Sequence, residues 1–252
     1  MGKIIGIVGG VGPYAGLDLN TKIFDNAPAK KDQDFPNVIL ISFSEIIGDR
    51  TMYVLNPEKH ENPAFSIAEV VATLAGAGAE YIGIPCNTAH CRPIFSKVEE
   101  IIAEKGLKVV LVNMIEETVS HILENYPRIK KVGLLSTLGT RAFGLYNEVA
   151  EKQGLELITP SQENAEAVHR AIYDAEFGIK AHSNPVHPKA TAIFEENAVK
   201  LFNEGAEAVI MGCTEIPLGL TSTKLKGIFI DPASILARKL LEKAGYQVKL
   251  ST

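Results

Sequence analysis

The sequence predicts an α/β protein of two similar domains, each a parallel sheet flanked by helices, related by a pseudo-two-fold axis. The first observation is an internal repeat with a constant offset. Segment 78–88 resembles 205–215, and segment 3–8 resembles 130–135, in both cases 127 residues further along. The second observation is that short apolar runs alternate with longer amphipathic ones, a pattern typical of βα units with parallel strands. We infer that about half of the chain has been duplicated.

The elements follow in order from this alternation. Segment 108–113 is echoed by 226–231 at a shorter offset of 118 residues, which supplies the last strand of each half. Pro13 and Pro232 stand where a proline suits the first turn of a helix. The expected strands are 3–8, 37–43, 80–85, 108–112, 131–135, 155–158, 207–211 and 227–230. The expected helices are 13–25, 63–77, 92–105, 114–125, 141–153, 162–176, 189–203 and 232–244.

Composition and charge exclude several classes of partner. The 252 residues carry a net charge of −5 and contain no basic run, so nucleic acid and anionic membrane surfaces are poor partners. The sequence has no apolar stretch as long as a membrane span, and Lys3 leads directly into a strand rather than into a signal peptide. Three cysteines, few and odd in number, suit a reducing compartment. We therefore expect a cytoplasmic protein.

Two cysteines occupy the same position of the repeat. Cys86 and Cys213 each follow a strand of buried character, which places them at the strand edge where ligands bind in parallel α/β sheets. Gly10 and its counterpart Thr137 are expected at the same edges. If the halves pack about a two-fold axis, the two cysteines face each other across a cleft. Two opposed thiols are suited to an isomerase that moves a proton between two faces of one carbon.

Two other motifs have simpler explanations. The run Gly10–Ala15 matches the dinucleotide fingerprint G-x-G-x-x-A, but Pro13 lacks the N–H that a pyrophosphate would bind. Cys86, His90 and Cys91 could suggest zinc, but C-x₃-H-C is not a familiar zinc spacing and no second ligand pair is near. We interpret His90 and Cys91 as the start of a helix, with Cys91 packed in the core. We expect neither a metal nor a cofactor.

Three segments resemble a known family. Segments 7–13, 85–90 and 212–217 are similar to those of the aspartate/glutamate racemase superfamily, and Glu215 after Cys-Thr resembles its aspartate branch. The resemblance implies cofactor-independent racemases with two cysteines as acid and base, two α/β domains of like topology and, commonly, a homodimer. It implies a first domain over 1–112, joined again by 226–252, and a second domain over 113–225.

The resemblance also assigns the candidate site residues. It implies that Cys86 and Cys213 are catalytic, that Arg50 recognises the side-chain carboxylate of aspartate, and that Lys180 assists it. Glu215 has three readings: it accepts a hydrogen bond from the substrate ammonium, it orients the Cys213 thiol, or it is a helix N-terminal acid. The stretch 182–188 fits no pattern of the family. The polar positions that hold the substrate's α-carboxylate and amino group are Asn87, Thr88, Thr137 and Thr214, with Gly10 as a further substrate contact.

The leading functional hypothesis is the interconversion of L- and D-aspartate by a two-cysteine, two-base proton transfer at Cα. One thiolate removes the proton from one face while one thiol supplies a proton to the other, and fixed hydrogen-bond donors stabilise the charge that develops on the α-carboxylate. The alternatives are a related isomerase, such as a glutamate or hydantoin racemase or a maleate isomerase, and a non-catalytic protein that binds small acids. A thiol redox role is a further option.

Overall fold

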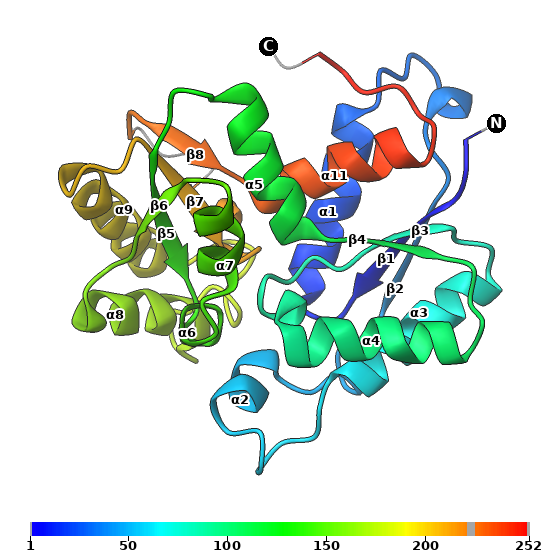
Figure 1. Cartoon of the computed structure of the whole chain (residues 1–252), viewed down its shortest axis with the longest axis horizontal. Helices are drawn as coiled ribbons and strands as arrows, with labels where there is room; N and C mark the ends of the chain where they lie inside the picture. The colour runs from blue at the N-terminus through cyan, green and yellow to red at the C-terminus, as the bar shows by residue number, and fades with distance from the viewer. Residues whose placement is uncertain (1, 221–224, 251–252) are drawn as a thin grey trace. The chain divides into compact units, whose positions relative to one another are not determined.

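The chain folds into two compact units that repeat one topology. The computed structural model describes residues 2–220 and 225–250. Unit 1 comprises Met1–Glu117 and Ala233–Thr252, and unit 2 comprises Thr118–Pro232. Each unit contains a four-stranded parallel sheet with helices around it (Figure 1). The predicted α/β class is confirmed.

Unit 1 is built on a sheet of order β2-β1-β3-β4, in which every pairing is parallel. Its strands are β1 (Ile5–Gly9), β2 (Val38–Ser42), β3 (Tyr81–Gly83) and β4 (Val110–Val112). Its helical segments are α1 (Pro13–Asn26), η1 (Asp32–Asp34), α2 (Arg50–Leu55), α3 (Ala64–Gly76), η2 (Thr88–His90), α4 (Arg92–Glu104), the start of α5 (Met114–Asn125) and nearly all of α11 (Pro232–Lys243).

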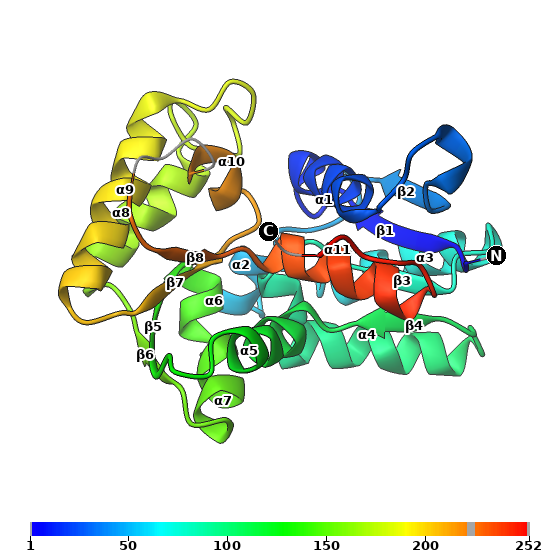
Figure 2. The same ribbon diagram turned by 90° about the horizontal axis from the view of Figure 1, so that it is seen from above.

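Helices cover both faces of this sheet (Figure 2). On one face, β1 forms a buried cluster with α1 and α11, and a side chain at Gly83 would collide with Leu240 of α11. On the other face, a side chain at Gly6 would touch Leu74 of α3. The all-buried strand β1 is what such two-sided cover requires.

Unit 2 has the same strand order, β6-β5-β7-β8, again parallel throughout. Its strands are β5 (Lys131–Ser136), β6 (Glu156–Ile158), β7 (Ala208–Gly212) and β8 (Ile228–Ile230). Helices α8 (Gln162–Tyr173) and α9 (Pro188–Asn203) cover one face through a cluster that includes Phe194 and Leu201. The remaining segments are most of α5, α6 (Leu138–Ala142), α7 (Leu145–Lys152) and α10 (Ile216–Leu220).

The strand registers reproduce the sequence repeat. Ile5 pairs with Tyr81 in unit 1, and the residues 127 positions later, Val132 and Ala208, pair in unit 2. The partner of Tyr81 on β4 is Val110, and that of Ala208 on β8 is Ile228, which is 118 positions later. Both offsets read from the sequence therefore hold at the level of individual residue pairs.

The structure differs from the sequence-based expectation in several respects. The expected helix 141–153 is broken between α6 and α7, because Gly144 adopts a left-handed conformation with a φ of 60°. Residues 226–252 were expected to return to the first domain together, but β8 is hydrogen-bonded to β7 within the sheet of unit 2, and only the chain from Ala233 onward joins unit 1. Between the expected strand 37–43 and the expected helix 63–77 lies the short helix α2. The Asp49 side chain caps this helix by accepting a hydrogen bond from Met52 N.

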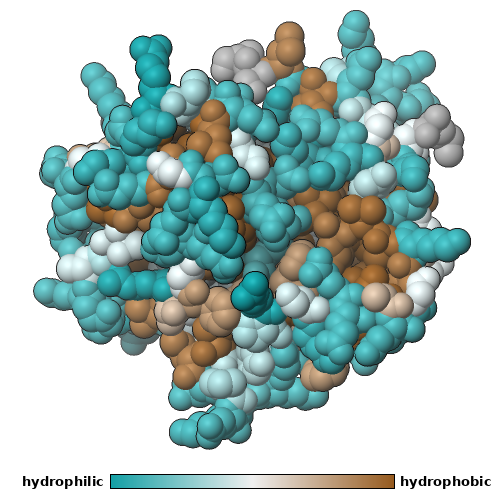
Figure 3. All heavy atoms as spheres, in the orientation of Figure 1, coloured by the Kyte–Doolittle hydropathy of each residue, from teal (hydrophilic) through white to brown (hydrophobic). Residues whose placement is uncertain are grey.

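The surface is mixed, with apolar side chains reaching solvent among polar ones (Figure 3). In unit 1, several exposed apolar side chains belong to one short stretch, namely Phe43, Ile46, Met52 and Leu55, each 41–50% exposed. Among the described residues, no helix has both the length and the apolar character that a membrane crossing needs.

Candidate active site

Cys86 lies just beyond the end of β3 and is buried, with 9% of its surface exposed. Its backbone is fixed on both sides: Cys86 N donates to Ile84 O at 2.8 Å, and Cys86 O accepts from Ala89 N at 3.2 Å. Asn87 and Thr88 follow it into η2 and are also buried. A thiol and two polar side chains are thus held at the carboxyl end of the central strand pair.

His90 stabilises the turn at Cys86 through a hydrogen bond and packs against a second ring. Its Nδ1 lies 2.9 Å from Cys86 O, and its ring stacks on Phe95 with centroids 4.8 Å apart. Burial lowers its pKa to about 4, so the ring is neutral at physiological pH. A carbonyl can only accept, so Nδ1 carries the proton in this contact. The sequence placed His90 at a helix start but did not anticipate this bond, for which its position four residues after Cys86 was the available signal.

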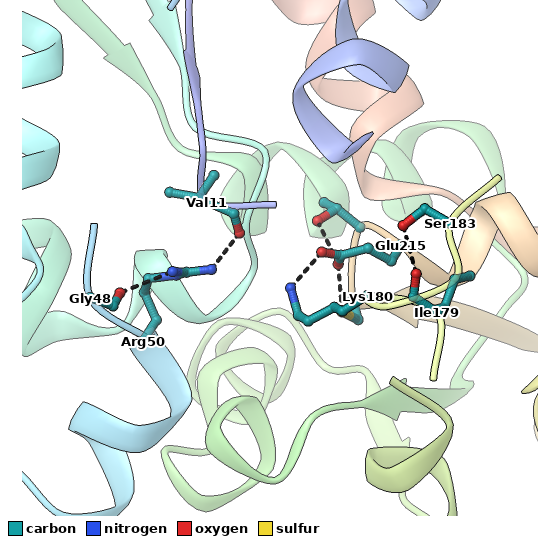
Figure 4. A network of polar contacts seen from close by, with 9 residues as sticks. Val11, Gly48, Arg50, Ile179, Lys180, Ser183 and Glu215 are labelled. Carbon is teal, nitrogen blue, oxygen red and sulfur yellow. Dashed lines mark hydrogen bonds and ion pairs between the residues drawn. The ribbon is translucent and has the colours of Figure 1, made fainter. Parts of the chain in front are cut away.

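Arg50 is the first residue of α2 and is only 7% exposed. Its Nη1 donates to Gly48 O at 2.9 Å, and its Nη2 donates to Val11 O in the loop after β1 (Figure 4). These two bonds fix the plane of the guanidinium and tie the loops after β1 and β2 together. A buried arginine placed so firmly is suited to planar recognition of a carboxylate.

Gly10 and Thr137 occupy equivalent places after β1 and β5. Gly10 has a positive φ of 81°, and a side chain there would come within 2.8 Å of the backbone of Phe43, so only glycine fits. Thr137 instead caps the N-terminus of α6, where its Oγ1 accepts from Thr140 N at 3.2 Å. Both residues satisfy local backbone requirements, so neither needs a ligand to explain its identity.

In unit 2, three side chains form a connected chain of polar contacts around one carboxylate (Figure 4). Lys180 Nζ lies 2.5 Å from Glu215 Oε1, and the Cys213 thiol lies 3.0 Å from Glu215 Oε2. Thr214 Oγ1 is 3.4 Å from the same Oε2. Cys213, Thr214 and Glu215 are all buried just beyond β7. The sequence predicted each of these four residues, and the fold brings them into one network.

This network determines the protonation of Cys213. Burial is the main cause that raises its pKa well above the ordinary value, and the adjacent negative charge of Glu215 raises it further. Lys180 opposes both effects but does not cancel them. Tyr146 on α7, wholly buried, is electrostatically coupled to Cys213. No sequence motif singles out Tyr146, because its electrostatic interaction with Cys213 arises only when α7 packs in unit 2.

Lys180 is positioned by a tight turn after α8. Lys180 N donates to Ile172 O at 3.1 Å, which folds the segment back on the last turn of the helix. A side chain at Gly178 would collide with the backbone of Asp174, so this turn requires glycine. Residues 182–188, which fit no sequence pattern, continue the turn through a bridge between Ser183 and Val186 and lead into α9.

The third cysteine is a packing residue, as predicted. Cys91 caps α4 and is fully buried, and burial raises its pKa to about 12. Within the described ranges, no group of three His, Cys, Asp or Glu side chains is arranged to hold a metal ion.

Comparison with known proteins assigns the chain to a family. Residues 8–240 match the model of the Asp/Glu/hydantoin racemases. The chain belongs to the Asp/Glu/hydantoin racemase family. The match spans both units and includes both cysteines, and it supports an isomerase of the racemase type for this member of the family.

Individual relatives within the family are distant but cover nearly whole chains. A broad-specificity amino-acid racemase from Bacillus subtilis (strain 168) is 26% identical, with 93% of this chain and 95% of that protein aligned. An aspartate racemase from Picrophilus torridus superposes with a TM-score of 0.81 at 27% identity, covering 98% of this chain and 96% of that one. An aspartate racemase homologue from Pyrococcus horikoshii OT3 superposes with a TM-score of 0.72 at 30% identity, covering 96% and 99%.

Proposed function

We propose that this family member is a cytoplasmic, cofactor-independent racemase that interconverts L- and D-aspartate, with Cys86 and Cys213 acting on opposite faces of Cα. The observation that carries the proposal is the equivalence of the two cysteines. They are 127 residues apart, and the strands that precede them pair at the same offset. Each is a buried thiol that follows a central strand of its sheet.

The proposed reaction exchanges one proton for another. One cysteine, as thiolate, takes the Cα proton and becomes a thiol, and the other, as thiol, gives its proton to the opposite face and becomes a thiolate. No bond other than Cα–H and S–H changes, so no oxidant or co-reactant is consumed. Cysteine suits both roles because its ordinary pKa, about 8.5, makes both forms accessible near neutral pH.

The negative charge that develops at Cα and on the α-carboxylate needs fixed donors. Asn87, Thr88, Thr137 and Thr214 are proposed to supply them, and all four are buried beyond strand ends. Gly10 has no side chain and is therefore proposed to let the substrate come close to the backbone after β1. Preorganised donors in a water-poor site are effective because they need no rearrangement as the charge forms.

Arg50 is proposed to bind the second carboxylate of aspartate. Its guanidinium is buried and fixed by two backbone carbonyls, so a bidentate contact would cost little further ordering of the side chain. Lys180 was expected to share this task, but its ammonium already contacts Glu215. We therefore give Lys180 the smaller part in recognising the acidic side chain.

A broader substrate range is the second candidate, and the Lys180–Glu215 ion pair favours it. The pair is electrically neutral, so unit 2 contributes little net attraction for a second carboxylate. A non-acidic amino acid would then lose mainly the contact with Arg50. The relative from Bacillus subtilis is itself a broad-specificity racemase.

We also propose a homodimer. The exposed apolar side chains between Phe43 and Leu55 offer unit 1 a surface that would be stabilised by burial against a second copy. Light scattering on the eluting protein in size-exclusion chromatography would give twice the chain mass if this is right, and the chain mass of 27.2 kDa if it is not.

The proposed activity is tested by incubating the purified full chain with single enantiomers in D₂O. L-Aspartate is expected to lose its Cα–H signal in proton NMR while chiral chromatography shows D-aspartate forming, without added pyridoxal phosphate or metal. The same assay on glutamate and alanine separates the two candidate ranges. Binding of aspartate with neither exchange nor racemisation would contradict the proposal and favour a small-acid binding protein.

A further inference from the structure

The carboxylate of Glu215 is held between a cation and a thiol inside unit 2. Its two oxygens have different partners: Oε1 accepts from Lys180 Nζ at 2.5 Å, and Oε2 accepts from Cys213 Sγ at 3.0 Å. The Glu215 side chain is 4% exposed and that of Lys180 is 24% exposed. A carboxylate ionised by its ion pair can only accept hydrogen bonds, so the proton of this S–H···O contact belongs to the sulfur.

The charged and titratable groups that face Cys213 reinforce this arrangement. Glu215 places a negative charge beside the sulfur, which disfavours a thiolate there. Tyr146 on α7 interacts electrostatically with Cys213 and with Asp231, the residue after β8. Neither Tyr146 nor Asp231 brings a positive charge. Lys180 is a cation that acts on the sulfur, and its ammonium is bound to Glu215. Burial and Glu215 together raise the pKa of Cys213, whereas Lys180 lowers it.

We propose that Glu215 is a positioning residue for Cys213: braced by Lys180, it keeps the sulfur in the thiol form and fixes the direction of the S–H bond. The acid–base order that follows rests on the proposed function. In the resting enzyme Cys213 is the proton donor and Cys86 is the base. Each complete transfer from this state leaves Cys213 as a thiolate beside Glu215 and Cys86 as a thiol. The resting state returns when Cys213 takes up a proton from solvent and Cys86 releases one to it. The pair thus gives two otherwise equivalent cysteines unequal resting roles.

The test is a titration of Cys213 that needs no turnover. In the full chain carrying Cys86→Ser and Cys91→Ala, Cys213 is the remaining thiol, and the ultraviolet absorbance of its thiolate is followed against pH. The same chain with Cys213→Ser supplies the tyrosine background. Cys213 is expected to titrate above the ordinary value of about 8.5. Glu215→Gln is expected to raise the acid dissociation constant roughly ten- to a thousand-fold, the usual effect of one adjacent charge.

Two further variants separate positioning from general structural support. Glu215→Asp keeps the charge and should stay close to the parent titration. Glu204→Gln removes an exposed charge elsewhere in unit 2 and should leave the titration unchanged. Circular dichroism checks that each variant is folded. If Glu215→Gln does not fold, the parent and Glu215→Asp titrations still test the proposal, because a Cys213 that titrates at or below the ordinary value in either chain would overturn it.

A parent chain whose Cys213 titrates at or below about 8.5 would overturn the proposal, as would a Glu215→Gln variant with an unchanged dissociation constant. A second readout depends on activity. In Cys86→Ala, where Cys213 alone could remove a proton, Glu215→Gln is expected to increase Cα–H exchange, while in the wild-type background it reduces racemisation. If the titrations behave as expected and no amino acid is racemised, the proposed function fails and the role of Glu215 stands.

Discussion

Replacing Arg50 by alanine tests whether acidic substrates are selected through unit 1. The guanidinium donates to Val11 O and Gly48 O and is 7% exposed. The variant should therefore change two quantities at once: the free energy of unfolding, through the lost bonds to the carbonyls, and kcat/KM for aspartate, through the lost contact with the second carboxylate.

The expected magnitudes differ enough to be separated. A hydrogen bond to a charged group contributes about 1.5–3 kcal/mol, so two of them predict a loss of roughly 3 kcal/mol or more in the free energy of unfolding. A charged contact with the substrate carboxylate, made in a buried setting, predicts a loss of about 2–4 kcal/mol in transition-state stabilisation. That corresponds to roughly a 30- to 1000-fold fall in kcat/KM for aspartate.

The assay is chiral chromatography of aspartate and alanine under conditions where the variant is shown to be folded. Alanine has no second carboxylate, so its turnover should change little. Arg141→Ala is the matched control, because Arg141 of α6 also donates to a backbone carbonyl, Pro160 O, and should affect stability without changing the ratio of the two substrates. Equal proportional losses on aspartate and alanine in Arg50→Ala would refute the assignment of Arg50 to the substrate.

Two further predictions concern the framework of the site. Because the pKa of His90 is about 4 when folded and 6.5 in the unfolded chain, the unfolded state binds more protons between these values. The free energy of unfolding should thus fall by roughly 3 kcal/mol from this residue as pH drops through that window, as measured by urea denaturation. Gly10→Ala should destabilise the protein by about 1–3 kcal/mol, because it forces a side chain into a positive φ of 81° against the backbone of Phe43.

Each of these two predictions has a control substitution within the chain. His90→Gln removes the titrating ring, so the difference in stability between wild type and variant should shrink as pH falls, and a constant difference would exclude His90 as a source of acid sensitivity. Gly76→Ala should instead stabilise by about 0.5–1 kcal/mol, because Gly76 is the last residue of α3 and no atom lies within 4 Å of the position that an added Cβ would take. A Gly10→Ala variant as stable as wild type would show that the turn after β1 tolerates a side chain.

The sequence predicted the fold well because the strands expected in one half could be compared with those expected in the duplicated half. Apolar runs alone indicate strands, but the constant offset between Cys86 and Cys213 also fixes which strands correspond. The pairing of Ile5 with Tyr81 and of Val132 with Ala208 confirms that correspondence. Repetition thus supplied long-range information that composition and periodicity do not contain.

Short elements and the unit boundary were less predictable. Helix α2 begins at Arg50 after the cap Asp49 and has six residues, too few to show a helical period. The final strand β8 was expected to join the first domain together with the C-terminal helix, whereas its hydrogen bonds to β7 hold it in unit 2. Which sheet a short strand joins depends on tertiary pairing, and Ile228–Ile230 carries no local signal for that choice.

The polar network shows the same limit at the level of side chains. The contact between Cys213 and Glu215 is local, and its spacing made an interaction one of the stated alternatives. The contact between Lys180 and Glu215 joins residues 35 positions apart through the turn that follows α8. The family resemblance assigned Lys180 to the substrate, and nothing in the chain marks that turn as folding toward Glu215.

The central claim is that Cys86 and Cys213 act on one Cα from opposite faces, with Cys86 as the resting base. The most direct measurement is Cα–H exchange in D₂O for each enantiomer of aspartate, in Cys86→Ala and Cys213→Ala compared with wild type. Both variants should lose racemisation, Cys213→Ala should keep exchange for one enantiomer only, and Cys86→Ala should exchange far more slowly. Near-wild-type racemisation in either variant, or exchange of both enantiomers in a single variant, would contradict the two-base account.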